Sequence, residues 1–180
     1  MDLRVKKTKS AIINSFLELR SKKPLERITV KELSDLAQIN KATFYLHYKD
    51  IYDLSESLEE ELLDNVLDRI SHPNAVLSEP KIFIRELIDG FVANQTLIDI
   101  IFSNDRRGIL VDRLESKVRE FLFENYPQCK DVPEINLLLS YTIKGGFYAF
   151  TDNIQYDTDT RSEIISEMAD VLAKSFLSNE

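Results

Sequence analysis

Polar side chains of four different types alternate along one short segment of the chain. Within residues 41–48 they are Lys41, Thr43, Tyr45 and His47. Ammonium, hydroxyl and imidazole groups form hydrogen bonds with phosphate oxygens and with the edges of bases. A surface helix that needs only solubility more often carries pairs of Glu and Lys. The residue types of this segment therefore favour contact with a nucleic acid.

A short helix must hold these side chains, and it is too short to be stable by itself in water. Asn40 can cap its start, and we expect Phe44 and Tyr48 to turn inward as anchors. A second short helix precedes it, with Thr29 as N-cap and Glu32 three residues later as a capping box. Two short helices joined by a tight turn are common, so this arrangement alone is weakly diagnostic.

Helical patterns fill the rest of the chain. Ile12, Phe16 and Leu19 form one apolar stripe in a first helix over residues 8–22. Asp50 can cap a fourth helix, with Asp53 at its third position. The remaining predicted helices cover residues 51–70, 81–102, 106–125, 134–153 and 160–177, the last with a capping box of Thr160 and Glu163. We find no convincing strand, so the sequence predicts an all-α fold of about nine helices.

The net charge of −8 conceals a strong asymmetry. Residues 1–50 carry eleven Lys and Arg against six Asp and Glu, an excess of five positive charges. Residues 51–180 carry twelve against twenty-five, an excess of thirteen negative charges. A basic head could sit on phosphates while an acidic body is repelled from them, which would fix the orientation of the protein.

The head resembles the DNA-binding domain of the TetR/AcrR family of bacterial one-component regulators over residues 8–54. Thr29 at the start of the second helix, Ala37 before the turn, and the run KATFYLHYK over residues 41–49 carry the resemblance. The remainder is similar only in architecture, to a helical body that binds an effector and dimerises through its last two helices. The resemblance implies a three-helix helix-turn-helix DNA-binding domain over residues 1–50 and an effector-binding and dimerisation domain over residues 51–180.

The resemblance also implies a set of DNA-contacting residues, namely Thr29, Asn40, Lys41, Thr43, Tyr45, His47 and Lys49. Thr29 would place a helix N-terminus against a phosphate. Lys41 and Thr43 lie nearest the start of the recognition helix and would read bases. The two ring-bearing side chains would clamp the DNA backbone, and Lys49 would pair with a phosphate. Four cations near the N-terminus would add non-specific contacts, namely Arg4, Lys6, Lys7 and Lys9.

One residue departs from the family pattern. The family usually has glycine in the turn, where a left-handed backbone is easiest, and here the position is Gln38. A non-glycine residue there costs about 1–2 kcal/mol, unless the turn takes a different shape.

Two adjacent glycines interrupt the apolar helix predicted over residues 134–153, at a cost of roughly 1 kcal/mol each against alanine. Close helix packing would offset this cost, either against a second copy of the chain or over an internal core. The resemblance favours an isologous dimer built as a four-helix bundle. Its predicted face consists of Leu138, Gly145, Gly146, Ala149, Met168, Leu172 and Phe176.

An effector pocket would lie in the body. Aromatic side chains there are candidate lining or simple core, namely Phe83, Phe91, Phe102, Tyr141 and Phe147. No spacing of His, Cys or carboxylates specifies a metal or a cofactor, and we expect neither. The single Cys129 allows no internal disulfide and fits a reducing cytoplasm, and we expect no signal peptide and no membrane span.

These observations predict a cytoplasmic homodimer that binds a palindromic double-stranded DNA operator and regulates transcription. We expect a repressor, released by a small-molecule or protein effector in the body. Two His, one Cys and no Gly-rich phosphate loop argue against an enzyme. The alternative is an interaction module of the same fold, or an activator that works with a protein co-regulator.

Overall fold

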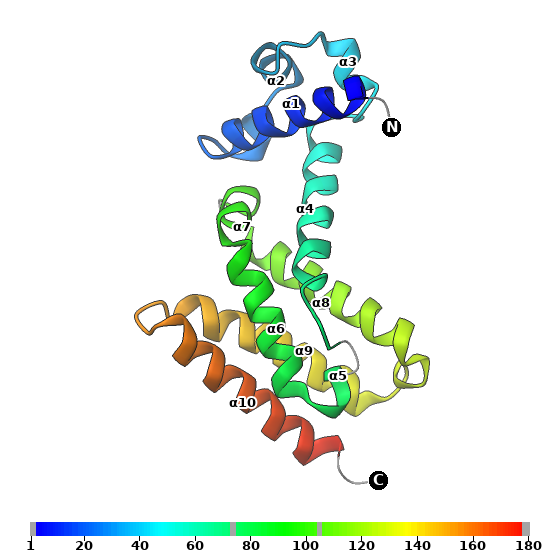
Figure 1. Cartoon of the computed structure of the whole chain (residues 1–180), viewed down its shortest axis with the longest axis vertical. Coiled ribbons are helices and arrows are strands. Elements are labelled where there is room, and N and C mark those ends of the chain that lie inside the picture. The colour runs from blue at the N-terminus through cyan, green and yellow to red at the C-terminus, as the bar shows by residue number, and fades with distance from the viewer. Residues whose placement is uncertain (1–2, 73–74, 104–105, 178–180) are drawn as a thin grey trace. The chain divides into compact units, whose positions relative to one another are not determined.

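The computed structural model describes residues 3–72, 75–103 and 106–177, and every regular element in these ranges is a helix. The predicted all-α fold is confirmed. Figure 1 shows the elements in chain order. They are α1 (Leu3–Arg20), the 3-10 turn η1 (Leu25–Arg27), α2 (Val30–Leu36), α3 (Lys41–Tyr45), α4 (Ile51–Leu67), α5 (Ala75–Ser78), α6 (Pro80–Ala93), α7 (Gln95–Ile101), α8 (Arg107–Asn125), the 3-10 turn η2 (Pro127–Cys129), α9 (Pro133–Asp152) and α10 (Thr158–Leu177).

The described residues form two compact units. The first contains residues 3–62, 96–103 and 106, and the second contains residues 63–72, 75–95 and 107–177. The first unit therefore combines the predicted head with most of α4 and with α7. The chain passes between the units within α4, after the first residue of α7 and before α8.

The core of the first unit forms around α1. Ile12 and Phe16 are completely buried and Leu19 is almost so, which confirms the apolar stripe that the spacing predicted. The basic residues near the N-terminus belong to the exposed first turns of α1, among them Arg4 and Lys6.

Buried charge holds the segment 96–106 to the rest of the first unit. The guanidinium of Arg20 donates from Nη2 to the carbonyl oxygens of Ile101 (3.4 Å) and Ser103 (3.0 Å), at the end of α7. A cation at the C-terminus of a helix is favoured by the helix dipole. Burial lowers the pKa of Arg20, and the positive charge of Arg106 lowers it further. Arg106 also donates to the buried carboxylate of Glu59 at 2.8 Å.

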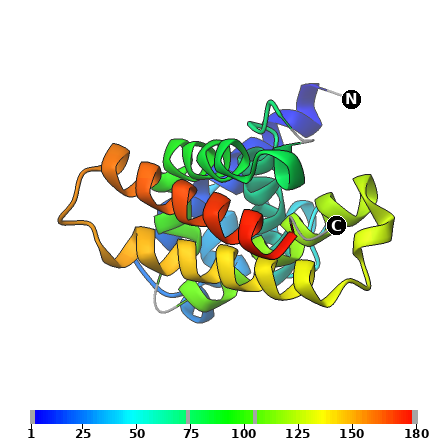
Figure 2. The ribbon, with the colours of Figure 1, turned by 90° about the horizontal axis from the view of Figure 1, so that it is seen from below.

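In the second unit, α10 lies between α6 and α9, and α8 packs on α9 (Figure 2). Apolar side chains of these helices face one another because they recur at helical spacing. Leu87 of α6, Ile143 and Phe147 of α9 and Ile165 of α10 are all buried.

Several helix boundaries differ from the sequence prediction: the first helix covers Leu3–Arg20 and the fourth ends at Leu67. Two further differences have a visible cause. The helix expected over residues 81–102 ends at Ala93, because the Asn94 side chain donates to the carbonyl of Gly90 (2.8 Å) and takes the helix cap. The last helix starts at Thr158, and the predicted cap at Thr160 is wrong. The Asp157 carboxylate accepts from the backbone N–H (2.9 Å) and the hydroxyl (2.6 Å) of Thr160 instead, which lowers the pKa of Asp157.

Gly90 marks the closest approach of α6 to the end of α4. A Cβ added at Gly90 would lie 2.4 Å from the carbonyl oxygen of Val66, which is backbone and cannot rotate away. A Cβ added at Gly108, in the first turn of α8, meets nothing within 4 Å. The two glycines therefore form a matched pair.

We expect Gly90→Ala to lower the free energy of unfolding by about 1–3 kcal/mol, because overpacking forces the two helices apart. Gly108→Ala should leave stability unchanged or raise it by up to about 1 kcal/mol, through helix propensity. Urea unfolding followed by circular dichroism measures both. Equal effects of the two substitutions would contradict the close approach of α6 to α4.

Candidate nucleic-acid interface

The turn between α2 and α3 has the hydrogen bonds of a Schellman motif. The N–H of Ile39 donates to the carbonyl of Ser34 (3.0 Å), and the N–H of Gln38 donates to that of Asp35 (3.3 Å). Gln38 has φ 54°, in the left-handed region that glycine adopts without steric cost. The turn thus keeps the left-handed geometry without a glycine.

The start of α2 is capped by its threonine. The Thr29 hydroxyl oxygen accepts from the backbone N–H of Glu32 at 3.3 Å, as predicted. The carboxylate of Glu32 pairs with the ammonium of Lys23, so only the threonine half of the predicted capping box forms. Thr29 itself is exposed at this helix end.

Capping and burial together hold the five residues of α3. The Asn40 Oδ1 atom accepts from the backbone N–H (2.7 Å) and the hydroxyl (2.8 Å) of Thr43. Phe44 is completely buried, and the buried ring of Tyr48 lies 5.9 Å from it between centroids. The inward positions predicted for both aromatic residues are confirmed.

The outward face of α3 is only partly the face that the sequence suggested. Lys41 and Tyr45 are exposed, as is Lys49 just beyond the helix. Thr43 is half-buried with its hydroxyl engaged by Asn40, and His47 is half-buried beside the ring of Tyr48. The other two exposed residues of this face, Ala42 and Leu46, are missing from the predicted set.

The helical period itself points to these missed residues. Ala42 and Leu46 lie two positions before and after Phe44, a rotation of about 200° at 3.6 residues per turn. They therefore face away from the core that Phe44 enters. The predicted set contained only polar side chains, so the apolar Ala42 and Leu46 were not included.

The position of Lys49 depends on the start of α4. Asp50 caps this helix, because its Oδ1 accepts from the N–H of Asp53 at 2.9 Å. The Asp53 carboxylate in turn accepts from the backbone N–H of Lys49 at 2.9 Å. Both N-cap bonds fix the main chain from which the Lys49 side chain extends.

The charge of this surface suits a polyanion. Among the described residues, neither Lys41 nor Lys49 has a carboxylate within ion-pairing distance, whereas Lys22 and Lys23 are each paired with a glutamate. Lys41 and Lys49 are each four residues from the exposed Tyr45, and each ammonium group can meet a phosphate.

A second surface, on α9 and α10, is apolar and exposed. Its large exposed side chains are Leu137, Tyr141, Tyr148, Ile164, Met168, Val171 and Phe176. A groove runs between Tyr141 and the α10 side chains Ile164, Met168 and Val171. At its edge, Lys81 of α6 pairs with two glutamates of α10.

The residues predicted for a dimer face divide between this surface and the packing inside the chain. Gly145, Ala149, Met168 and Phe176 are exposed, whereas Leu138 and Leu172 are half-buried. A Cβ added at Gly146 would lie 3.3 Å from Ile165, so this glycine lets α10 approach α9. A Cβ added at Gly145 meets nothing within 4 Å.

Two small pockets, of about 40 Å³ each, lie among the helices of the second unit. Phe91 and Phe147 line the first, with their rings edge to face and 5.8 Å apart. Phe83 lines the second. The other two predicted pocket residues lie elsewhere: Phe102 is buried in the first unit and Tyr141 is 64% exposed.

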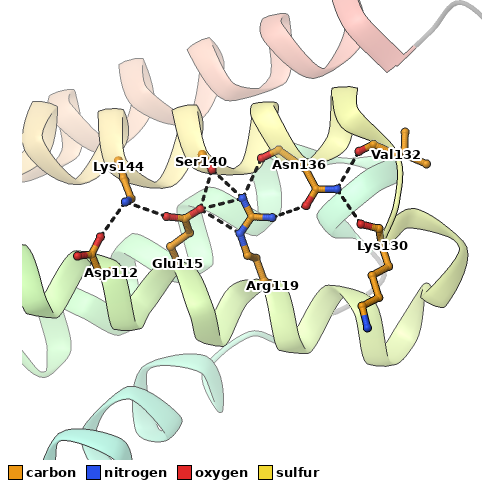
Figure 3. Close-up of polar contacts among 8 residues, drawn as sticks. All are labelled: Asp112, Glu115, Arg119, Lys130, Val132, Asn136, Ser140 and Lys144. Carbon is orange, nitrogen blue, oxygen red and sulfur yellow. Dashed lines mark hydrogen bonds and ion pairs between the residues drawn. The ribbon is translucent and has the colours of Figure 1, made fainter.

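A polar network joins α8 to α9 (Figure 3). The Glu115 carboxylate accepts from Arg119 (2.8 Å) and from the hydroxyl of Ser140 (2.7 Å), and it pairs with Lys144 (3.2 Å). Burial raises the pKa of Glu115, but these hydrogen bonds outweigh it and hold the pKa below its ordinary value. Arg119 also donates to the carbonyl of Asn136 at 2.9 Å. These contacts fix the position of α8 along α9.

The described residues hold no group of three or more His, Cys, Asp or Glu placed to bind a metal ion. Cys129 is buried in η2. None of the helices in the described ranges is both long enough and apolar enough to cross a membrane.

Solved structures share this fold, although no protein-family model and no curated protein matches the sequence. A protein from Syntrophomonas wolfei assigned to the TetR family of transcriptional regulators is 19% identical, with a TM-score of 0.66 over 97% of this chain and 99% of that one. A transcriptional regulator of the TetR/AcrR family from Aquifex aeolicus is 16% identical, with a TM-score of 0.58 over 92% of this chain and 99% of that one. The chain therefore has the fold of TetR-family regulators, and the resemblance seen in its sequence is confirmed at the level of fold.

The left-handed turn gives a test of its own. We expect Gln38→Gly to raise the free energy of unfolding by about 0.5–1 kcal/mol, because relief of the left-handed conformation exceeds the entropy that glycine adds to the unfolded chain. Gln38→Ala keeps a Cβ atom and should leave stability unchanged. Urea unfolding of both variants decides the matter, and indistinguishable glycine and alanine variants would contradict a strained turn.

Proposed function

We propose that this protein is a one-component transcriptional regulator that binds duplex DNA through α3. The observation that carries the proposal is the exposed side of α3, where Lys41 and Tyr45 are exposed, followed by exposed Lys49, on a helix that Phe44 anchors in the core. An α-helix fits the major groove, and ammonium and phenol groups there can contact both phosphates and bases.

His47 and Thr43 are half-buried, and we assign each of them one kind of contact with DNA. His47 lies beside Tyr48, so it contacts the DNA backbone rather than a base. The Thr43 hydroxyl donates to Asn40, which leaves its oxygen lone pairs for a donor on a base. Thr29 stands exposed at the start of α2 and faces a phosphate.

We propose further that the protein is a homodimer through α9 and α10. Monomeric proteins rarely expose a contiguous apolar surface of this kind, and such surfaces usually mark an interface. Gly145 supports the choice, because an open glycine in the middle of a helix has no use inside the chain but permits close approach of another helix. Two heads could then bind the two halves of a palindromic operator.

We propose that an apolar effector binds in the second unit by widening its two small pockets. Apart from Thr142, the side chains that line the two pockets are apolar. A molecule without charge would need no ionic partner there, and it could enlarge the space between α6 and α9. Because α4 belongs to both units, a shift of its second half would be felt by the first half. We propose that such an effector releases the protein from its operator, which makes the protein a repressor.

The proposed function predicts DNA binding that can be measured. We expect the purified protein to bind duplex DNA from upstream of its own gene, with affinity that falls steeply as salt rises. Tyr45→Ala should weaken binding about tenfold, through loss of a hydrogen bond to a charged group. Lys49→Ala should weaken it and reduce the salt slope by about one, because one phosphate contact is lost. Fluorescence anisotropy across a salt series measures both.

Lys130→Ala, at an exposed lysine of the second unit, is the matched control and should leave the slope unchanged. Binding to no DNA at low salt would contradict the proposal and favour a module that acts through a protein partner.

The second prediction concerns assembly. We expect the protein to sediment as a dimer and Met168→Glu to sediment as a folded monomer, because burying an unpaired carboxylate is costly. Ile109→Glu changes an exposed isoleucine of α8 and should remain dimeric. Analytical ultracentrifugation with circular dichroism separates dissociation from unfolding. A wild-type monomer at micromolar concentration would overturn the dimer.

A further inference from the structure

Leu46 is the most exposed large hydrophobic residue among those that the structure describes, at 83%. It lies in the segment 41–49, in which Lys41, Tyr45 and Lys49 are also exposed. A leucine is normally buried, because removing its side chain from water is favourable. Its exposure at this position therefore needs a reason.

Leu46 is not exposed by fraying of the chain. Its backbone is helical, with φ −74° and ψ −18°, and its N–H lies 3.2 Å from the carbonyl of Ala42 and 3.3 Å from that of Thr43. The inward positions around it belong to Phe44 and Tyr48, which are both buried. The helix thus directs the Leu46 side chain outward and fixes it there.

Ala42 extends the apolar surface by one turn. It precedes Leu46 by four residues, so the two side chains lie on one face of the helix, and both are exposed. This pair forms a narrow strip of methyl groups, flanked by Lys41 and Tyr45. A strip of this kind adds nothing to contact with phosphates, so it must serve something apolar between them.

We propose that Leu46, with Ala42 beside it, reads the 5-methyl group of thymine in the major groove. This inference rests on the proposed function. In the major groove, thymine alone of the four bases presents a methyl group, and apolar side chains are its usual partners. The excess of five positive charges over residues 1–50 suits a polyanion. Duplex DNA is the polyanion that presents a methyl group between two rows of phosphates, which matches an apolar strip flanked by lysines.

The test replaces thymidine by deoxyuridine, one position at a time, in a duplex that the protein binds. This change removes only the methyl group and leaves every base pair and hydrogen-bonding edge in place. We expect wild-type protein to lose about fourfold in affinity at one or two positions of each half-site and nothing elsewhere. Leu46→Ala should bind thymidine and deoxyuridine duplexes equally at those positions, as a double-mutant cycle requires. Ile109→Ala, at an exposed isoleucine of α8, should retain the wild-type pattern.

The outcomes separate the inference from the function on which it rests. Binding by the wild-type protein that is unaffected by deoxyuridine at every position overturns the role of Leu46 and leaves DNA binding intact. A deoxyuridine effect that persists in Leu46→Ala also overturns it, because another residue then reads the methyl group. Absence of any DNA binding by the wild-type protein overturns both. The deoxyuridine series on wild-type protein needs no variant, so a folding defect cannot obscure the result.

Discussion

The burial of one phenylalanine fixes the surface on which the proposed function depends. A helix of five residues is not stable by itself in water, so α3 forms only because contacts with the rest of the first unit hold it in place. Phe44 does this from within the core, and Asn40 completes the first turn with its side chain. Once the direction of Phe44 is set, the helical period determines which side chains point outward. Lys41, Tyr45 and Leu46 reach the surface as a consequence.

Charge is used differently in the two units. In the first, Arg20 and Glu59 are buried, and they bind the segment 96–106 to α1 and α4 through main-chain carbonyls and Arg106. Losing one partner would leave a buried charge uncompensated, which is strongly unfavourable. The segment between α6 and α8 therefore belongs to the same compact unit as the proposed DNA-binding surface.

In the second unit, several polar side chains bond to one another between α8 and α9, and the interior that faces α6 and α10 is apolar. The network of Glu115, Arg119 and Ser140 satisfies its own charges between α8 and α9. This leaves the interior facing α6 and α10 to apolar side chains, with Thr142 as the polar exception in the pockets. The two adjacent glycines of α9 also divide their roles, since Gly146 accommodates Ile165 whereas Gly145 faces outward.

The sequence by itself determined the helical fold, the inward direction of Phe44 and Tyr48, the caps at Thr29, Asn40 and Asp50, and the basic head. These features depend on neighbours within a few positions, and local periodicity and capping chemistry record them. Only the tertiary structure decided that Phe102 belongs to the first unit and that Tyr141 lies in an exposed groove. It also brought Arg20 to the end of α7, some eighty residues away in the chain. Such contacts join segments that are distant in sequence, and no local pattern of side chains encodes which of them will meet.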